Sequence, residues 1–344
     1  MRRAAALLLA SLAALPGAAV AEMSLPPGFT AKVYVTGEGF DESRRAIGIP
    51  STSALVFGAD GVLYASRAGR RYVGGEIEDV WPIYRFPPGG ARLTKETEGK
   101  AFYGPPLPNP QVAGVRGSDV LVTTYDRDRV VGVLYRLVDG RAELLAGGTP
   151  PSRLTPPVLK QPEGVAFDAE GNILVADRQH NAVMKLDANG KMLEPRWLSF
   201  GRPRLLVARG DRLWVAADGE AEAPWARGTG EIWSVGPDGR KLALRGPIAA
   251  GMDVSPGGQL FVADRTGARV MAVGADATSV DLVTFADGDA PRAIVFAPVT
   301  EATRRAGIAG DLFISVIRRG TWSLNEIIRV SGPFDEHVRA KLPR

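Results

Sequence analysis

Six segments of the sequence repeat one pattern, in which two apolar runs flank a short turn. The clearest copy is EGVAFDAEGNILVAD from Glu163, and SALVFGADGVLYAS from Ser53 and AGMDVSPGGQLFVAD from Ala250 resemble it closely. More divergent copies are QVAGVRGSDVLVTTYD from Gln111, RLLVARGDRLWVAAD from Arg204, and RAIVFAP with GDLFISV from Arg292. Their starts are roughly 40 to 60 residues apart, which suits a four-stranded blade with its loops. This period predicts a circular all-β fold.

Each copy is followed by further extended runs joined by turn residues, for example EIWSVGP and KLALRG around PDGR. One blade cannot bury both of its faces, so neighbouring blades must stack around an axis. We therefore predict a six-bladed β-propeller of four-stranded blades. The run LPPGFTAKVYVTG has no repeat of its own, and we expect its strand, at about residues 29–36, to close the ring as the outermost strand of blade six. The alternative is that HVRAKL near the C-terminus supplies this strand.

The first 21 residues have the features of a cleaved secretory signal. Arg2 and Arg3 precede an apolar stretch that is too short to span a bilayer, and the small-residue site Ala19-Val20-Ala21 follows. We expect ordinary Sec export rather than twin-arginine export, a periplasmic or secreted location, and no transmembrane span after cleavage. Residues 22–344 then form a single propeller domain, which we expect to be a monomer.

Charge and cysteine content narrow the chemistry. Without Arg2 and Arg3, 40 of the 42 basic residues remain against 38 acidic residues, and the charges are interspersed. This balance disfavours nucleic-acid and anionic-membrane partners. There is no cysteine, so packing rather than disulfides must hold the fold, and zinc-thiolate sites and cysteine nucleophiles are excluded.

The topology of a blade predicts where function lies. The start of the first strand and the connection between the second and third strands share one rim, so one channel mouth should gather the first residues of all six copies. These predicted mouth residues are Ser53, Gln111, Glu163, Arg204, Ala250 and Arg292. The longest connections on this rim carry Trp225 and Trp322, which either stack on a ligand or pack the loops onto the blades.

Glu163, Arg204 and Arg292 depart from the repeat. One carboxylate and two guanidinium groups leave an excess of positive charge at the mouth, which favours an anionic ligand, with Ser53 and Gln111 as further ligand contacts. The alternative is structural: Glu163 pairs with Arg204, and Arg292 meets water or backbone carbonyls.

Two other residue types are candidates for chemistry or for turns. His180 lies on the same rim as Glu163, which suggests a base oriented by a carboxylate, although a polar residue in a surface turn explains His180 equally simply. An aspartate ends the second run of four copies, at Asp126, Asp177, Asp218 and Asp264. We expect these carboxylates to cap turns, because the nearby sequences lack the alternating oxygen ligands of a calcium loop.

Two family resemblances bear on function. QPEGVAFDAEGNILVADRQHNAVMKLDANGKML resembles an NHL repeat, while LPPGF and APRAIVFAP with GDLFISVIRRGTW resemble the soluble quinoprotein glucose and sorbosone dehydrogenases. Both families are six-bladed propellers. The second resemblance implies pyrroloquinoline quinone (PQQ) and calcium as cofactors, with Arg204 and Arg292 on the quinone carboxylates and His180 as the base. The Asn-His-containing loop motif of that family is missing from this sequence.

A third propeller family, the gluconolactonases, holds a divalent metal with Glu, Asn and Asp. The matching positions here are Ser53, Glu163 and Ala250, so we predict no such metal site. The sequence therefore favours an exported NHL-type propeller that binds a small anionic or polyhydroxylated ligand, or a partner segment, at the loop-rich mouth. The alternative function is a PQQ-dependent sugar or alcohol dehydrogenase.

Overall fold

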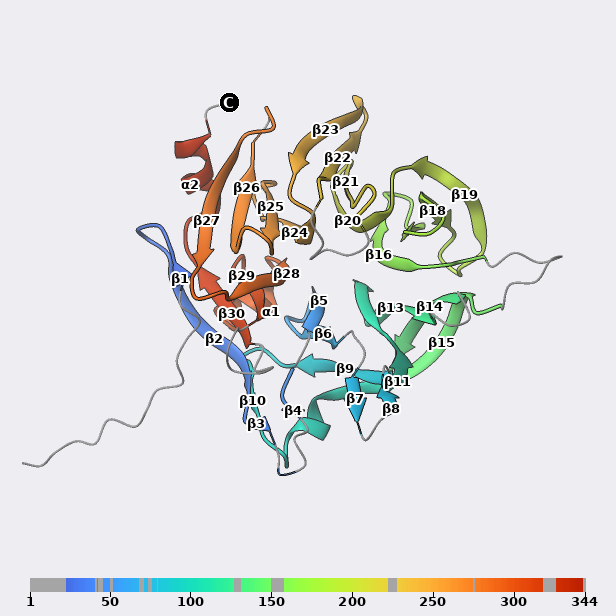
Figure 1. The fold of residues 1–344 in the computed structure, drawn as a ribbon, viewed down its shortest axis with the longest axis horizontal. Helices are drawn as coiled ribbons and strands as arrows, with labels where there is room; N and C mark the ends of the chain where they lie inside the picture. Colours follow the sequence, from blue (N-terminus) through green and yellow to red (C-terminus); the bar gives the residue numbers. More distant parts are fainter. Residues whose placement is uncertain are drawn as a thin grey trace, which may run out of the picture.

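The prediction of a six-bladed β-propeller is confirmed by the computed structural model. The structure describes residues 23–40, 42, 46–49, 52–67, 71–73, 76–78, 80–126, 131–149, 158–221, 228–274, 276–317 and 326–342. Within these ranges, six sheets of four or five strands surround a central axis (Figure 1). No helix in these ranges is long and apolar enough to span a bilayer.

The blades follow the chain in order. Blade one contains β5 (Thr52–Phe57), β6 (Leu63–Arg67), β9 (Val80–Phe86) and β11 (Phe102–Pro108), and blade two contains β12 (Gln111–Arg116), β13 (Asp119–Asp126), β14 (Val131–Val138) and β15 (Arg141–Gly147). Blade three contains β16 (Pro162–Phe167), β17 (Ile173–Asp177), β18 (Ala182–Leu186) and β19 (Met192–Ser199). Blade four contains β20 (Pro203–Arg209), β21 (Arg212–Ala217), β22 (Gly230–Gly236) and β23 (Gly239–Gly246).

The last two blades each contain a segment from the N-terminal part of the chain. Blade five consists of β24 (Ala249–Val254), β25 (Leu260–Asp264), β26 (Arg269–Val273) and β27 (Ser279–Phe285), with β1 (Met23–Ser24) at its edge. Blade six consists of β28 (Ala290–Phe296), β29 (Leu312–Ile317), β30 (Glu326–Ser331) and β2 (Thr30–Gly37), with β10 (Ala91–Leu93) beyond β2.

The N-terminal strand closes the ring as predicted, although β10 and not β2 is the outermost strand of this sheet. Strand β2 pairs antiparallel with β30, with Ala31 opposite Val330 and Val33 opposite Ile328. Figure 1 shows the blue N-terminal strands against the orange and red C-terminal blades. The alternative assignment of HVRAKL to the closing strand is wrong, because these residues belong to helix α2 (Phe334–Lys341). Phe334 and Val338 anchor this helix on the hydrophobic core between blades five and six.

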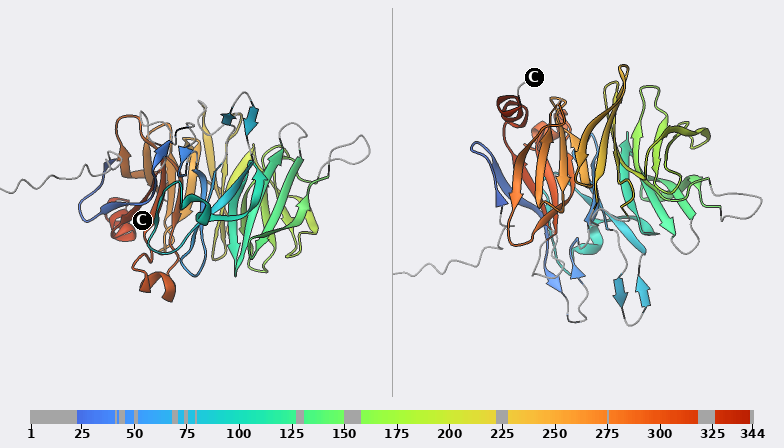
Figure 2. Two further views of the ribbon diagram at one scale, coloured as in Figure 1. Left: turned by 90° about the horizontal axis from the view of Figure 1, so that it is seen from below. Right: turned by 45° about the horizontal axis from the view of Figure 1, so that its top comes forward.

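The remaining described elements are small. They are the hairpins β3 (Gly39–Phe40) with β4 (Ala46–Ile47) and β7 (Arg71–Val73) with β8 (Glu76–Glu78), the 3-10 helix η1 (Glu98–Ala101), and helix α1 (Glu301–Arg305). Figure 2 shows β7 and β8 projecting from one rim and α1 from the other. The blade-six insertion therefore lies opposite the long connection of blade one.

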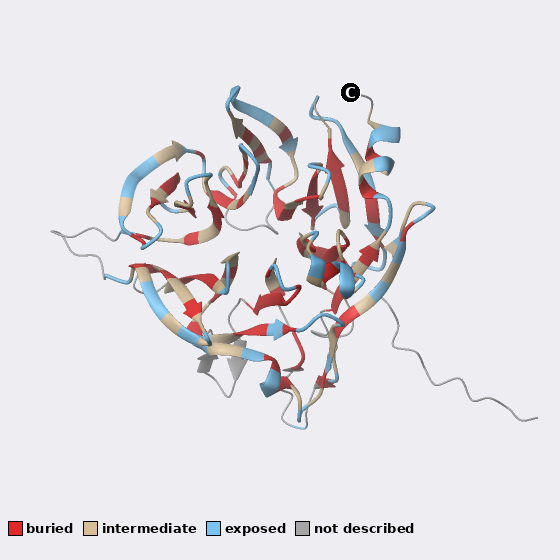
Figure 3. Cartoon of the chain, turned by 180° about the vertical axis from the view of Figure 1, so that it is seen from behind, coloured by how far each residue is buried: buried red, intermediate tan, exposed pale blue. Residues whose placement is uncertain are grey.

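Alternation along the second strand of each blade builds the core. In β17, Ile173 and Val175 pack toward blade two, whereas Leu174 and Ala176 pack toward blade four. Because blade three is covered on both faces, the residues from Ile173 to Ala176 are all apolar and buried rather than only every second one. Figure 3 shows this buried interior, with exposed residues at the outer edges and turns.

Candidate functional site

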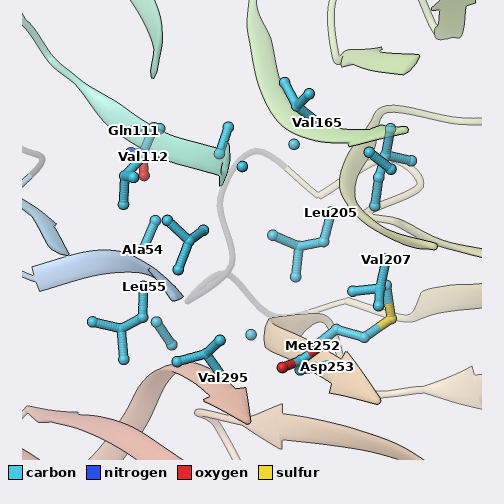
Figure 4. A pocket seen from close by; sticks show the side chains of 18 of the residues that line it. Ala54, Leu55, Gln111, Val112, Val165, Leu205, Val207, Met252, Asp253 and Val295 are labelled. Atoms are coloured by element: carbon cyan, nitrogen blue, oxygen red, sulfur yellow. The ribbon is translucent and has the colours of Figure 1, made fainter. Parts of the chain in front are cut away.

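The inner strands β5, β12, β16, β20, β24 and β28 enclose a cavity of about 890 Å³ along the axis. We define the channel mouth as the end of this cavity where these six strands begin. Ser53, Gln111, Glu163, Arg204, Ala250 and Arg292 all contribute to the cavity wall, as the repeat alignment predicts. Figure 4 shows side chains from all six strands around the open centre. Residues that are distant in sequence thus share one cavity.

A β-bulge near the start of each inner strand shapes the mouth. The pairing register shifts between Thr52 and Ala54 in β5, and between Pro203 and Leu205 in β20, so that Ser53 and Arg204 are the inserted residues. The corresponding shifts in β16, β24 and β28 span Glu163, Ala250 and Arg292. In β12 the shift falls at Ala113, two residues after Gln111. Bulges re-aim side chains, which explains why these positions escape the regular alternation of the strands.

Arg204 is held by a buried ion pair rather than left open for a ligand. Its Nε donates to both carboxylate oxygens of Asp218, at 2.8 and 3.1 Å, and its Nη2 donates to the backbone carbonyl of Ala249. Arg204 is 5% exposed and Asp218 is 1% exposed. The ligand-binding role expected for Arg204 is therefore not observed, and in the structural alternative Asp218 takes the place of Glu163 as its partner. Asp218 is an ion-pair partner rather than a turn cap.

Asp218 also faces a second arginine. The Nε of Arg178 lies 3.4 Å from Asp218 Oδ2, and the Nη2 of Arg178 donates to the Ala221 carbonyl. One carboxylate thus serves two guanidinium groups, both of which line the cavity. The mouth keeps a net positive charge even after its buried ion pair is counted.

Arg292 is the least compensated of these cations. Among the described residues it has no hydrogen-bond or ion-pair partner, and its half-buried side chain lines the cavity. Burial, together with the positive charges of Arg265 and Arg204, lowers the pKa of Arg292 to about 10. The group therefore stays charged at neutral pH and faces the cavity with donors that no described residue accepts.

The remaining polar groups at the mouth form short networks. Glu163 Oε1 accepts a hydrogen bond of 2.9 Å from Gln161 Nε2, and burial raises the pKa of Glu163 although Arg204 opposes this shift. Ser53 Oγ donates to Gln111 Oε1 at 2.9 Å, across the boundary between blades one and two. These pairs join neighbouring residues of the mouth and leave hydroxyl and amide groups at its wall.

His180 occupies a different position from the one a base would need. Its Nδ1 lies 3.1 Å from Asp177 Oδ2, and its side chain is not part of the cavity wall. Asp177, not Glu163, is the carboxylate beside it. Asp177 also accepts from the backbone N–H of His180, and Asp264 accepts in the same way from Gly267, so the capping prediction is confirmed for these two aspartates.

Some cavity residues escaped the sequence analysis. Arg178 and Arg265 line the mouth, and Asp253 lines the cavity further along β24. The sequence could have indicated the two arginines, because each directly follows the aspartate that ends a second strand, in LVADRQ and FVADRT. Trp225 and Trp322 lie outside the described residues. Within the described ranges, no group of three or more His, Asp or Glu side chains is placed to hold a metal ion.

Solved structures with similar folds are propellers of several activities. The PQQ-bound aldose sugar dehydrogenase of Streptomyces coelicolor is 13% identical over 90% of this chain and 100% of its own, with a TM-score of 0.57. A putative oxidoreductase (glucose dehydrogenase) of Thermus thermophilus is 15% identical over 88% and 100%, with a TM-score of 0.54. A streptogramin B lyase is 12% identical over 89% and 98%, with a TM-score of 0.50.

These likenesses define the class of the protein, a six-bladed β-propeller, and at such low identity they define the fold alone. No family model and no curated protein matches the sequence. The function therefore has to be argued from the cavity itself.

The residues of the cavity fit one half of a quinoprotein site. Arg292 and Arg265 would hold the carboxylates of pyrroloquinoline quinone, whereas Arg204, which the sequence resemblance assigned to this role, is engaged by Asp218 and Ala249. The histidine base of the quinoproteins has no counterpart in the cavity wall, because the chain has two histidines and neither lines the cavity: His180 faces Asp177, and His337 on α2 packs edge-on against Phe29. We therefore derive no redox step for this protein.

Proposed function

We propose that this protein is an exported NHL-type β-propeller that binds a small anionic ligand at its arginine-rich channel mouth. The observation that carries the proposal is Arg292, whose guanidinium lines the cavity without a partner among the described residues. A poorly solvated cation beside Arg265 and Arg204 is unfavourable by itself, and a bound carboxylate offsets that cost through charge-assisted hydrogen bonds. Export rests on the predicted signal at residues 1–21.

The other mouth residues suit a supporting role. Arg204 and Arg178 are oriented by Asp218, so they add a positive field without having to move. Ser53, Gln111 and Gln161 supply polar contacts at the rim of the same cavity. This arrangement favours a ligand with one concentrated negative charge that sits next to Arg292.

The proposal is tested by calorimetric titration of the mature protein with acetate, gluconate and PQQ at low ionic strength. Arg292→Met removes the charge but keeps an unbranched side chain, and Arg141→Met on the exposed start of β15 is the matched control. A charge-assisted hydrogen bond contributes about 1.5 to 3 kcal/mol, so Arg292→Met should weaken carboxylate binding roughly 10- to 150-fold. The control should bind as the wild type does.

Two results would count against the proposal. If the wild type binds none of the three carboxylates, or Arg292→Met binds them unchanged, the mouth is not an anion site. The dehydrogenase alternative has its own readout, dye reduction with PQQ, calcium and a panel of sugars. If sugars are turned over and His180→Ala abolishes this turnover, the protein is a dehydrogenase rather than only a binding protein.

A further inference from the structure

The cavity wall is charged at the mouth and largely apolar farther along the axis. Beyond the mouth, half-buried apolar side chains form much of its wall, including Val56 of β5, Leu205 and Val207 of β20, and Val295 of β28. Figure 4 shows Leu205, Val207 and Val295 around the open centre, with Leu55, Val165 and Met252 beside them. Leu205 and Val207 are two residues apart, so they extend the apolar wall by about 7 Å along the strand.

The charged residues of the wall are unevenly placed. Glu163 and four arginines, namely Arg178, Arg204, Arg265 and Arg292, belong to the mouth. Farther along the strands, the wall contains Asp253 on β24 and Arg209 at the end of β20, and Arg209 donates to the Pro256 carbonyl at 3.0 Å. Positive charge therefore dominates at the mouth, and an apolar section separates it from the other end.

Asp253 limits what the far section accepts. Its two carboxylate oxygens accept backbone N–H groups from Val254 at 2.8 Å and from Phe296 at 2.6 Å. Asp253 lies three residues beyond Ala250, which is about 10 Å along the strand from the mouth. A second negative charge on a ligand at that depth would face this carboxylate in a poorly solvated wall. Arg209, the cation of this section, already faces Asp253 and donates to the Pro256 carbonyl, so the cavity favours one charge at the mouth and none deeper.

We propose that the ligand is an amphipathic monocarboxylate, whose carboxylate binds at Arg292 and whose apolar body lies along the axis between β5, β20 and β28. This inference rests on the proposed function and specifies its ligand class. A cavity of about 890 Å³ is of the size that holds small molecules. A sugar acid would meet the same arginine, but its hydroxyl groups would lose water opposite Leu205, Val207 and Val295, which offer no side-chain hydrogen bonds.

The test titrates the mature protein with hexanoate, octanoate and gluconate, and with octanedioate as the doubly charged analogue of octanoate. Burial of a methylene contributes about 0.8 kcal/mol, so each added methylene should tighten binding by roughly threefold to fourfold, and octanoate should bind about tenfold tighter than hexanoate. Gluconate and octanedioate should both bind at least about tenfold more weakly than octanoate.

A double variant tests whether the apolar wall of the cavity binds the chain of the ligand. Val207→Thr combined with Val295→Thr keeps the shape of both side chains, places hydroxyl groups in the wall, and should weaken octanoate roughly tenfold while leaving acetate unchanged. Val80→Thr, on the exposed start of β9, is the control. Circular dichroism and thermal unfolding verify that the variants fold.

The possible results distinguish the proposed ligand class from the proposed anion site. If carboxylates bind through Arg292 but chain length has no effect, or gluconate binds as tightly as octanoate, the ligand is not amphipathic and the anion site stands. If no carboxylate binds, the anion site and the ligand class both fall.

Discussion

Arg204 and Asp218 form a buried ion pair in the wall of the channel mouth, with Arg204 Nε 2.8 Å from Asp218 Oδ2. The two residues belong to the same blade, on β20 and at the end of β21, and Arg178 from blade three approaches the same carboxylate at 3.4 Å. Asp218 therefore links blades three and four, through Arg178 and Arg204, at the point where the cavity opens.

Asp218→Asn should destabilise the protein strongly, because it leaves Arg204 buried without its counter-charge. Loss of one partner of a buried pair typically lowers the free energy of unfolding by about 3 to 5 kcal/mol. Asp238→Asn is the control, since Asp238 pairs with Lys241 and Arg212 on the surface and the substitution should lower stability far less than Asp218→Asn. Urea unfolding of both variants measures the difference, and equal losses would contradict the structural role of Asp218.

Asp253 should give the protein a measurable pH dependence. Burial raises the pKa of Asp253 from 3.8 to about 6, so between these pH values the folded state binds more protons than the unfolded chain. Stability from this group is present below about pH 4 and is lost as pH rises through 6, by on the order of 3 kcal/mol in total. Asp253→Asn should remove this part of the pH dependence.

The measurement compares the free energies of unfolding of the wild type and Asp253→Asn at pH 4.5 and pH 7. The contribution of His337, whose pKa is lowered by burial and by Lys341, is common to both proteins and cancels in the difference. A difference that does not change with pH would show that Asp253 keeps an ordinary pKa.

Gly164 should be intolerant of a side chain. A Cβ atom at this position would lie 2.7 Å from the carbonyl oxygen of Arg204 and 2.8 Å from the amide nitrogen of Leu206, where the inner strands of blades three and four approach each other. Gly164→Ala should therefore cost about 1 to 3 kcal/mol of stability through overpacking. Gly246→Ala is the control, because a Cβ there meets nothing within 4 Å. Equal unfolding midpoints in the two variants would rule out a tight contact.

Removal of residues 23–36 from the mature chain should lower the melting temperature substantially. The deletion removes most of β2, including the buried Val35, and leaves β30 with an unpaired edge. A synthetic peptide of residues 23–37 should restore part of the loss when it is added to the truncated protein. Unchanged melting after the deletion would show that β2 is not needed to hold the ring.

The fold was predictable from the sequence because its signal is repeated. Six copies of two apolar runs set the number of blades, and the unmatched strand in LPPGFTAKVYVTG indicated the closure that β2 makes with β30. The same alignment brought Ser53, Glu163, Arg204 and Arg292 to one cavity. The helix at residues 334–341 escaped this reasoning, because a short apolar and polar alternation suits a strand edge as well as a helix.

The pairing of side chains within the site was less predictable. Arg204 was expected to contact a ligand or, in the alternative, to pair with Glu163 at the equivalent position of the neighbouring blade, whereas its partner Asp218 comes from its own blade. Similarly, His180 was expected beside Glu163, but Asp177 three residues earlier is closer. Repeat alignment places residues on a rim, and bulges and local turns then decide which way each side chain points.

The pairing of β2 with β30 makes the ring depend on both ends of the chain. A ribosome synthesises β2 before the other strands of blade six, and β30 after β28 and β29, so blade six cannot be completed before β30 has been made. Any product that stops before Glu326 keeps an open sheet edge, and such edges invite aggregation and proteolysis. Only a chain that contains both β2 and β30 can therefore close the propeller.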